Sequence, residues 1–478
     1  MLKKIFTFIG LVIALLIVIV LVQTWRFSKA IPFTKALPIP ALTDSSVLHL
    51  SKALQIKTVS YSDTTATDSV AFTQFRVFLE TAYPLIHQQL QRTIINQFSY
   101  IYEWKGKNSS LLPYILMAHS DVVPVEKAGE KLWHVPPFAG TITDTAVLGR
   151  GAIDDKGSLI AILEATEQLL SQHFQPERTI YLCFGHTEEI GGRKGAQDIA
   201  DYLFKKNVKA SLVLDEGGIV TKENFKELGR PIALIGVTEK GYATFELTVE
   251  KEGGHSSMPA KETAIDILSN ALVNLRKQQM PVHITPPTNV MLEKIGPGLG
   301  FTTRMALANR WLFEPMLVAQ FQKANATNAS IHTTIVPTII SSGIKDNVIP
   351  TEAKAIVNSR IIPGETAADV EVFMKKQVND ERVNIKLVFG SQASRIASLD
   401  SNGYKTVEAA AYKVFDNVVP VPFLMIGATD SRYYEKVSDN VLKFNPCTDP
   451  KGFHGIDERI MLDDFKRMIF FYQLVIKE

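Results

Sequence analysis

The residues best suited to chemistry are two adjacent carboxylates, Glu188 and Glu189. They follow an apolar run, residues 180–184, and precede Gly191 and Gly192, where the backbone can turn sharply. Two neighbouring carboxylates at the end of a buried strand are costly unless a positive group holds them. The stretch therefore predicts metal ions as their partner.

Other potential metal ligands lie in four further places. His119 and Asp121 follow an apolar strand, and their spacing of two residues directs both side chains to one side. Zinc sites that activate water use His, Asp and Glu ligands. Asp215, at the end of a third apolar run, is a candidate of this kind. Each place alone also has an ordinary interpretation, such as a helix N-cap for Asp154 or a loop histidine for His454.

Taken together and in order, these motifs resemble the di-zinc aminoacylase/carboxypeptidase family of metallohydrolases. The likeness runs from about Leu48 to the C-terminus and rests on His119, Asp154, Glu188-Glu189, Asp215, the segment 253–257 around His255, and His454. It implies two zinc ions as cofactors: Asp154 bridges them, His119 and Asp215 complete one, and Glu189 and His454 the other. Glu188 is then the general base that takes a proton from water and passes it to the leaving amine.

The resemblance implies roles for four more side chains. Asp121 would orient the His119 imidazole or touch the substrate. His255 would stabilise the oxyanion of the tetrahedral intermediate, often from the partner subunit, although it could also be a plain turn histidine. Arg360 and Arg432 are candidates to bind a substrate carboxylate, and both could equally form surface ion pairs.

The elements that position these residues follow an α/β pattern. Apolar strands alternate with helices over 46–239, and three strands end in polar residues, which predicts one site at the carboxyl ends of the strands. Residues 240–389 read as β-α-β-β-α-β, a ferredoxin-like unit with an insertion at about 281–337. The α/β pattern resumes over 390–478. We therefore expect a zinc-peptidase-like catalytic domain with a central mixed sheet, split in sequence by a ferredoxin-like lid or dimerisation domain.

The N-terminus predicts a membrane anchor. Lys3 and Lys4 precede an uncharged run from Ile5 to Gln23, which is close to the length that spans a bilayer as a helix. No small-residue cleavage site follows, so residues 1–26 read as an uncleaved signal anchor, with a cleaved signal peptide as the alternative. A proline-bearing stalk, 27–45, comes next. We expect a single-pass membrane protein with its catalytic domain outside the cytoplasm, in the periplasm or the extracellular space.

The overall charge argues against one class of partner, nucleic acid. The net charge of +2, from 51 basic and 49 acidic residues, gives no reason to expect nucleic acid as a partner.

The resemblance implies hydrolysis of the amide bond of N-acyl amino acids. The acyl chains would be fatty if the substrate comes from the bilayer, and the reaction could also run in reverse. A carboxypeptidase or dipeptidase is the alternative, and a homodimer through the lid domain is implied. A catalytically silent binding protein is disfavoured because none of the expected site residues is lost.

Overall fold

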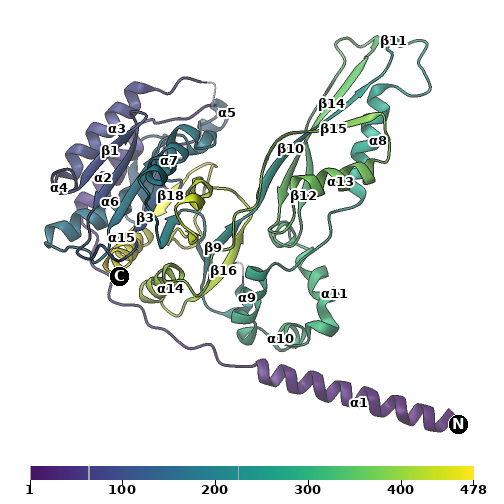
Figure 1. Cartoon of the computed structure of the whole chain (residues 1–478), viewed down its shortest axis with the longest axis horizontal. Coiled ribbons are helices and arrows are strands. Elements are labelled where there is room, and N and C mark those ends of the chain that lie inside the picture. The colour runs from purple at the N-terminus through teal and green to yellow at the C-terminus, as the bar shows by residue number, and fades with distance from the viewer. Residues whose placement is uncertain (1, 63–64, 224) are drawn as a thin grey trace. The chain divides into compact units, whose positions relative to one another are not determined.

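The computed structural model describes residues 2–62, 65–223 and 225–478 (Figure 1). The chain forms two compact units, each built from separate segments. The larger unit contains residues 30–237, 397–423 and 429–478. The smaller unit contains residues 1–29, 238–396 and 424–428.

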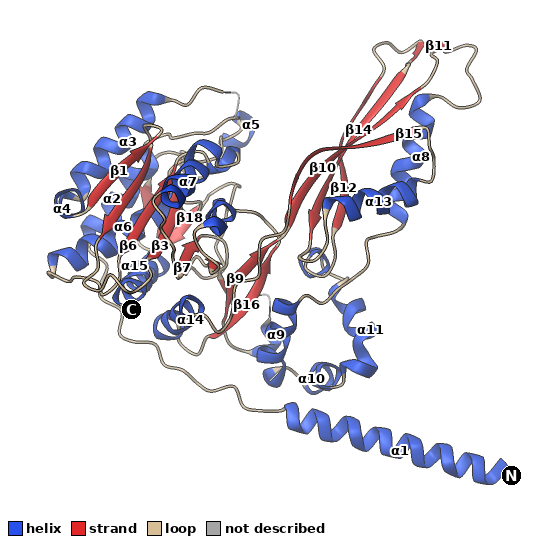
Figure 2. Ribbon diagram, in the orientation of Figure 1, coloured by secondary structure: helices blue, strands red, loops and turns tan. Residues whose placement is uncertain are grey.

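A nine-stranded mixed sheet forms the centre of the larger unit, as expected for an α/β fold (Figure 2). Its strands lie in the order β1-β2-β6-β3-β7-β17-β9-β16, with β8 paired to β9. Three adjacent strands, β6, β3 and β7, run parallel. The strand bounds are β1 Gln91–Ile95, β2 Ser99–Trp104, β3 Tyr114–His119, β6 Ile180–Gly185, β7 Leu212–Asp215, β8 Val220–Thr221, β9 Ile232–Glu239, β16 Val419–Met425 and β17 Val441–Lys443.

Helices bury both faces of this sheet. Side chains alternate along each strand, so that Leu116 packs in the core beneath α6 while Met117 packs in a second core beneath α7. Buried apolar side chains occur all round α6, which is typical of a helix enclosed by neighbours. The helix bounds are α2 Asp44–Gln55, α3 Ser69–Ala82, α4 Pro84–Gln89, α5 Lys127–Glu130, α6 Lys156–Ser171, α7 Asp198–Lys205, α14 Asn402–Val414 and α15 Leu462–Lys477. A small sheet joins β4 Thr141–Ile142, β5 Ala146–Leu148 and β18 Arg459–Met461.

The smaller unit contains the expected β-α-β-β-α-β series. Its antiparallel sheet has the order β12-β14-β10-β15, the arrangement of a ferredoxin-like fold. Both helices begin with a capping box, at Thr263 and at Thr366, which satisfies free backbone N–H groups. The bounds are β10 Gly241–Glu250, α8 Ala264–Lys277, β12 Thr334–Ser342, β14 Glu352–Ile361, α13 Ala367–Val378 and β15 Val383–Ser391, with the short pair β11 Gly254–His255 and β13 Val348–Ile349.

Two further parts belong to the smaller unit. The insertion between α8 and β12 is helical, with α9 Pro286–Ile295, α10 Phe301–Ala308, α11 Arg310–Phe321 and α12 Asn325–Ala329. The N-terminal run forms α1, Leu2–Phe27, a helix long and apolar enough to cross a membrane. A membrane span and a signal sequence share these properties, so the helix alone does not separate the two.

Candidate metal centre

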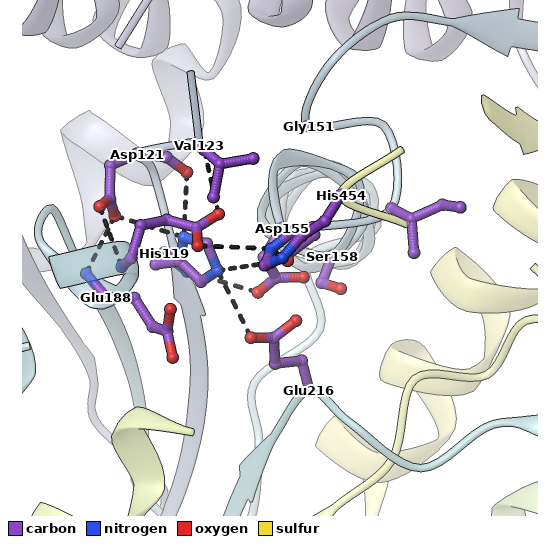
Figure 3. Close-up of polar contacts among 12 residues, drawn as sticks. His119, Asp121, Val123, Gly151, Asp155, Ser158, Glu188, Glu216 and His454 are labelled. Atoms are coloured by element: carbon purple, nitrogen blue, oxygen red, sulfur yellow. Dashed lines mark hydrogen bonds and ion pairs between the residues drawn. The ribbon is translucent and has the colours of Figure 1, made fainter. Parts of the chain in front are cut away.

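The candidate site lies at the carboxyl ends of the three parallel strands (Figure 3). His119 is the last residue of β3 and lies beside Gly185, the last residue of β6. The chain continues from β6 into a short 3-10 turn, Glu188–Ile190. The sequence predicted that these strand ends converge, and the structure confirms it.

Two groups of potential metal ligands share one carboxylate. His119, Asp154 and Glu216 form the first group, and Asp154, Glu189 and His454 form the second, with the donor atoms of each group within 4.8 Å of one another. Asp154 uses a different oxygen in each. Its Oδ1 lies 2.8 Å from His119 Nε2 and its Oδ2 lies 2.6 Å from His454 Nε2. This is the arrangement of a carboxylate that can bridge two metal ions.

The spacing of the other donors fits zinc. Two donors at about 2.1 Å from a tetrahedral zinc ion lie about 3.4 Å apart. His119 Nε2 lies 3.4 Å from Glu216 Oε1, and His454 Nε2 lies 3.4 Å from Glu189 Oε2. The donor set of imidazoles and carboxylates is also the one that catalytic zinc uses.

The electrostatics of the site favour cations. Burial, together with neighbouring carboxylates, raises the pKa of Glu188 and of Glu216 well above the usual range. His454 has its pKa raised to about 10 by hydrogen bonds to Asp154 and then Glu189. Several carboxylates thus face one buried space and draw positive charge into it. A pair of divalent cations would supply that charge.

Asp121 positions both the histidine ligand and the two glutamates. His119 Nδ1 lies 3.3 Å from Asp121 Oδ1, which leaves Nε2 to face the ligand group. The same carboxylate accepts hydrogen bonds from the backbone N–H groups of Glu188 and Glu189, at 3.2 and 3.3 Å. Asp121 is fully buried. These contacts fit the orienting role, and the role of Asp121 stays a prediction.

Glu458 holds the loop that carries Asp154, a role that was not predicted from the sequence. Its Oε1 accepts from the N–H groups of Ile153 and Asp154, at 2.8 and 3.1 Å. Its Oε2 accepts from the N–H group of Gly151 and from the Arg150 guanidinium. The signal that could have indicated it is an acidic residue four positions after His454, opposite a glycine-flanked loop rich in free N–H groups.

The metal-ligand role predicted for Asp215 stays a prediction. The structure places Glu216, not Asp215, in the group of potential ligands with His119 and Asp154, and the Asp215 carboxylate accepts a hydrogen bond of 3.0 Å from the Ser431 N–H group. The reason is strand alternation: Asp215 continues the face of Val213, which packs away from α6. Glu216 follows the end of β7 and turns to the opposite side, toward His119 (Figure 3).

The turn after Glu188 is held from the segment that follows β16. Gly191 and Gly192 adopt φ values of +97° and +69°. A Cβ on Gly192 would lie 1.8 Å from Asp430 Oδ1, so only glycine fits against that carboxylate. Arg432 donates a hydrogen bond of 3.2 Å to the Gly191 carbonyl. The predicted substrate ligand Arg432 therefore lies beside the glutamate turn.

The other two predicted site residues belong to the smaller unit. His255 is exposed in β11, and its Nδ1 lies 2.7 Å from the Ser257 hydroxyl. Arg360, in β14, stacks over the Tyr242 ring at 4.8 Å from the centroid. These contacts of the two residues lie within their own unit, and their catalytic and substrate-binding roles stay predictions.

Comparison with known proteins gives the chain a family. The model of peptidase family M20/M25/M40 matches residues 115–478. The chain belongs to this family. It is 36% identical to probable carboxypeptidase S-like 2 of Dictyostelium discoideum, over 98% of this chain and 92% of that protein. It is 34% identical to the N-fatty-acyl-amino acid synthase/hydrolase PM20D1 of Xenopus tropicalis, over 88% of this chain and 83% of that protein.

A solved structure shares the fold. The M20 family metallo-carboxypeptidase Sso-CP2 of Sulfolobus solfataricus superimposes with a TM-score of 0.66 at 19% identity, covering 91% of this chain and 99% of that one. The expected zinc-peptidase-like α/β fold is thus confirmed. Family membership and the named relatives make the chain a hydrolase that acts on amide or peptide bonds.

Proposed function

We propose that this protein is a membrane-anchored di-zinc hydrolase that cleaves the amide bond of N-acyl amino acids. The observation that carries the proposal is the position of Asp154, whose two oxygens face His119 in one ligand group and His454 in the other. Glu216 completes the first group and Glu189 the second. When bound there, zinc would polarise the amide carbonyl and lower the pKa of a water molecule to about 7.

Side chains of the protein would carry out proton transfer, positioning and substrate binding. Glu188 belongs to neither ligand group, so its carboxylate can take the proton of the attacking water and deliver it to the leaving nitrogen. Asp121 keeps the turn of Glu188 in place through the backbone hydrogen bond. Arg432, held beside that turn, would bind the carboxylate of the amino acid product, and Arg360 of the smaller unit is a second candidate for this role. His255 of the smaller unit would stabilise the oxyanion of the tetrahedral intermediate.

The substrate class is supported by the relatives named N-fatty-acyl-amino acid synthase/hydrolase and by the apolar helix α1. An anchored enzyme is placed beside a store of acyl chains, and we propose a catalytic domain outside the cytoplasm. A second candidate is release of C-terminal amino acids from short peptides, which the carboxypeptidase S-like relative favours. Dimerisation through the ferredoxin-like unit belongs to the proposal in either case.

Hydrolysis by the full-length protein in detergent micelles tests the substrate. N-acyl amino acids of rising chain length and a set of dipeptides are compared by kcat/KM. We expect long acyl chains to be preferred, and a preference for dipeptides would establish the second candidate instead.

Substitution of Glu188 tests the mechanism. Glu188→Gln should lower kcat by about 10²–10⁴-fold, the usual contribution of general acid–base catalysis, with zinc content unchanged. The control is Glu130→Gln, at an exposed glutamate at the end of α5, and it should keep the kcat and the zinc content of the unsubstituted protein. Full activity in Glu188→Gln would refute the assignment of the base.

A further inference from the structure

The helical insertion of the smaller unit packs against the end of α1. The corner between α10 and α11 is the contact point: the Asn309 side-chain amide donates hydrogen bonds of 3.2 Å to the Val20 carbonyl and to the Thr24 hydroxyl. Val20 and Thr24 are 8% and 2% exposed, unlike most of the helix before them. The final turns of α1 are therefore part of this unit's packing.

Two more contacts extend this interface. The Trp311 indole N–H donates a hydrogen bond of 3.1 Å to Gln23 Oε1. A Cβ on Gly296 would lie 2.6 Å from the Phe27 ring, so the end of α1 approaches the insertion as closely as a glycine permits. Contacts of this kind suit a helix that stays attached to the mature protein better than a leader that is removed.

The depth of the contact follows from the helix rise. Val20 lies inside the uncharged run that ends at Gln23, and three residues of α-helix span about 4.5 Å. When α1 crosses a bilayer, its apolar run occupies the hydrocarbon. Asn309, bonded to both Val20 and Thr24, then lies level with the end of this run, at the boundary between headgroups and hydrocarbon.

The side chains exposed around this corner suit that position. Phe301, Trp311, Leu312 and Met316 are 54%, 58%, 46% and 48% exposed. The nearby Arg310 is paired, with Glu314 at 3.3 Å and with the Asn289 side chain. A cluster of exposed large apolar side chains marks an interaction surface, and tryptophan is enriched where membrane meets water.

We propose that Phe301, Trp311, Leu312 and Met316 form a membrane-binding surface, the α10–α11 platform, which inserts into the outer leaflet beside α1. This rests on the proposed anchoring through α1. The occupant is lipid rather than a second copy of the chain, because the platform continues directly from the apolar surface of α1 and lies at the level of the hydrocarbon boundary. The smaller unit would thus be attached to the membrane by a spanning helix and by an embedded surface.

Spin labels on the full-length protein in phosphatidylcholine vesicles test the platform. Leu312→Cys carries the label on the platform, and Val372→Cys, 69% exposed on α13 of the same unit, is the water-exposed control. Leu15→Cys, 60% exposed on α1, reports on the anchor. The native Cys183 and Cys447 are buried and stay unlabelled. Collisions with oxygen, which dissolves in hydrocarbon, are compared with collisions with a water-soluble nickel chelate.

We expect the oxygen-to-nickel ratio at Leu312 to exceed that at Val372 severalfold and to approach that at Leu15. A water-like ratio at Leu312 with a membrane-like ratio at Leu15 would overturn the platform and leave the anchor intact. Water-like ratios at both would overturn the anchor as well. Protection of Leu312 from both reagents, with dipolar broadening between labels, would show a second copy on the surface and also overturn the proposal.

Tryptophan fluorescence gives a test without a label on the platform. In Trp25→Phe, the remaining tryptophans are Trp311, on the platform, and Trp104 and Trp133, which are buried at 6% and 9% exposure. Lipids brominated near the headgroup end of their acyl chains should quench the emission of Trp311. Quenching equal to that of Trp25→Phe with Trp311→Phe added would contradict the proposal.

Discussion

Exchanging the neighbours Asp215 and Glu216 for their amides tests the ligand assignment most directly. Both side chains are buried and adjacent in sequence, and each amide keeps the shape of the acid it replaces. Only Glu216 lies in a ligand group, 3.4 Å from His119 Nε2. Glu216→Gln should therefore lose zinc, and Asp215→Asn should keep it.

The expected magnitudes follow from the contacts. Loss of an outer partner of a metal ligand costs about 10–100-fold in metal affinity, so loss of the ligand Glu216 should cost more than about 100-fold, or about 2.7 kcal/mol. The charge agrees: Asp154, Glu189 and Glu216 offset three of the four positive charges of two zinc ions, and Glu216→Gln leaves a second charge uncompensated. Asp215→Asn weakens a charge-assisted hydrogen bond from Ser431, which costs about 1 kcal/mol of stability.

Competition with a fluorescent zinc chelator measures both affinities. Hydrolysis assays and thermal unfolding on the same preparations separate loss of metal from loss of fold. Equal zinc affinity in Glu216→Gln and the unsubstituted protein would refute the assignment, and loss of zinc only in Asp215→Asn would restore the ligand that the sequence indicated.

Three further predictions concern the glycine turn, a buried lysine and the metal itself. Gly192→Ala and Gly191→Ala should each lower the free energy of unfolding by about 1–2 kcal/mol, because alanine is strained in the left-handed backbone conformation of both positions. Only Gly192→Ala should also lower kcat/KM, because its Cβ meets Asp430 whereas the Cβ on Gly191 meets open space. Burial, then the charge of Arg360, lowers the pKa of Lys240 to about 8. Since the unfolded chain keeps this proton up to about pH 10.4, denaturant unfolding should show stability rising with pH between about 8 and 10, and Lys240→Met should remove that rise. A chelator should abolish turnover reversibly with unchanged circular dichroism, because Glu458 and Asp121 hold the ligand loops by hydrogen bonds to backbone N–H groups; unfolding on chelation would contradict this.

The convergence of the site could be predicted from the sequence because parallel strands place their carboxyl ends at one edge of a sheet. Apolar runs before His119 and Glu188 were sufficient signals for those strands. The β-α-β-β-α-β unit was predictable for a similar reason, since its alternation of period two and period 3.6 survives a long insertion.

That Glu216, rather than Asp215, lies beside His119 could not be predicted. Alternation of side chains fixes the face of a residue inside a strand, but the residue after the strand end can turn either way. Glu458 was missed because its role depends on N–H groups of a loop about 300 residues away, at 2.8 and 3.0 Å from its oxygens. A local sequence pattern does not indicate a contact between residues so far apart in the chain.

The pairing of the Asp154 loop with Glu458 has a consequence for biosynthesis. The ribosome makes α1 and the Asp154 loop long before the segment with His454 and Glu458. A nascent chain that ends before this segment therefore lacks both one potential ligand of the second group and the carboxylate that holds the Asp154 loop. Metal loading of the paired site should therefore wait until residues 454–458 have been made, and products terminated before them should lack a complete site.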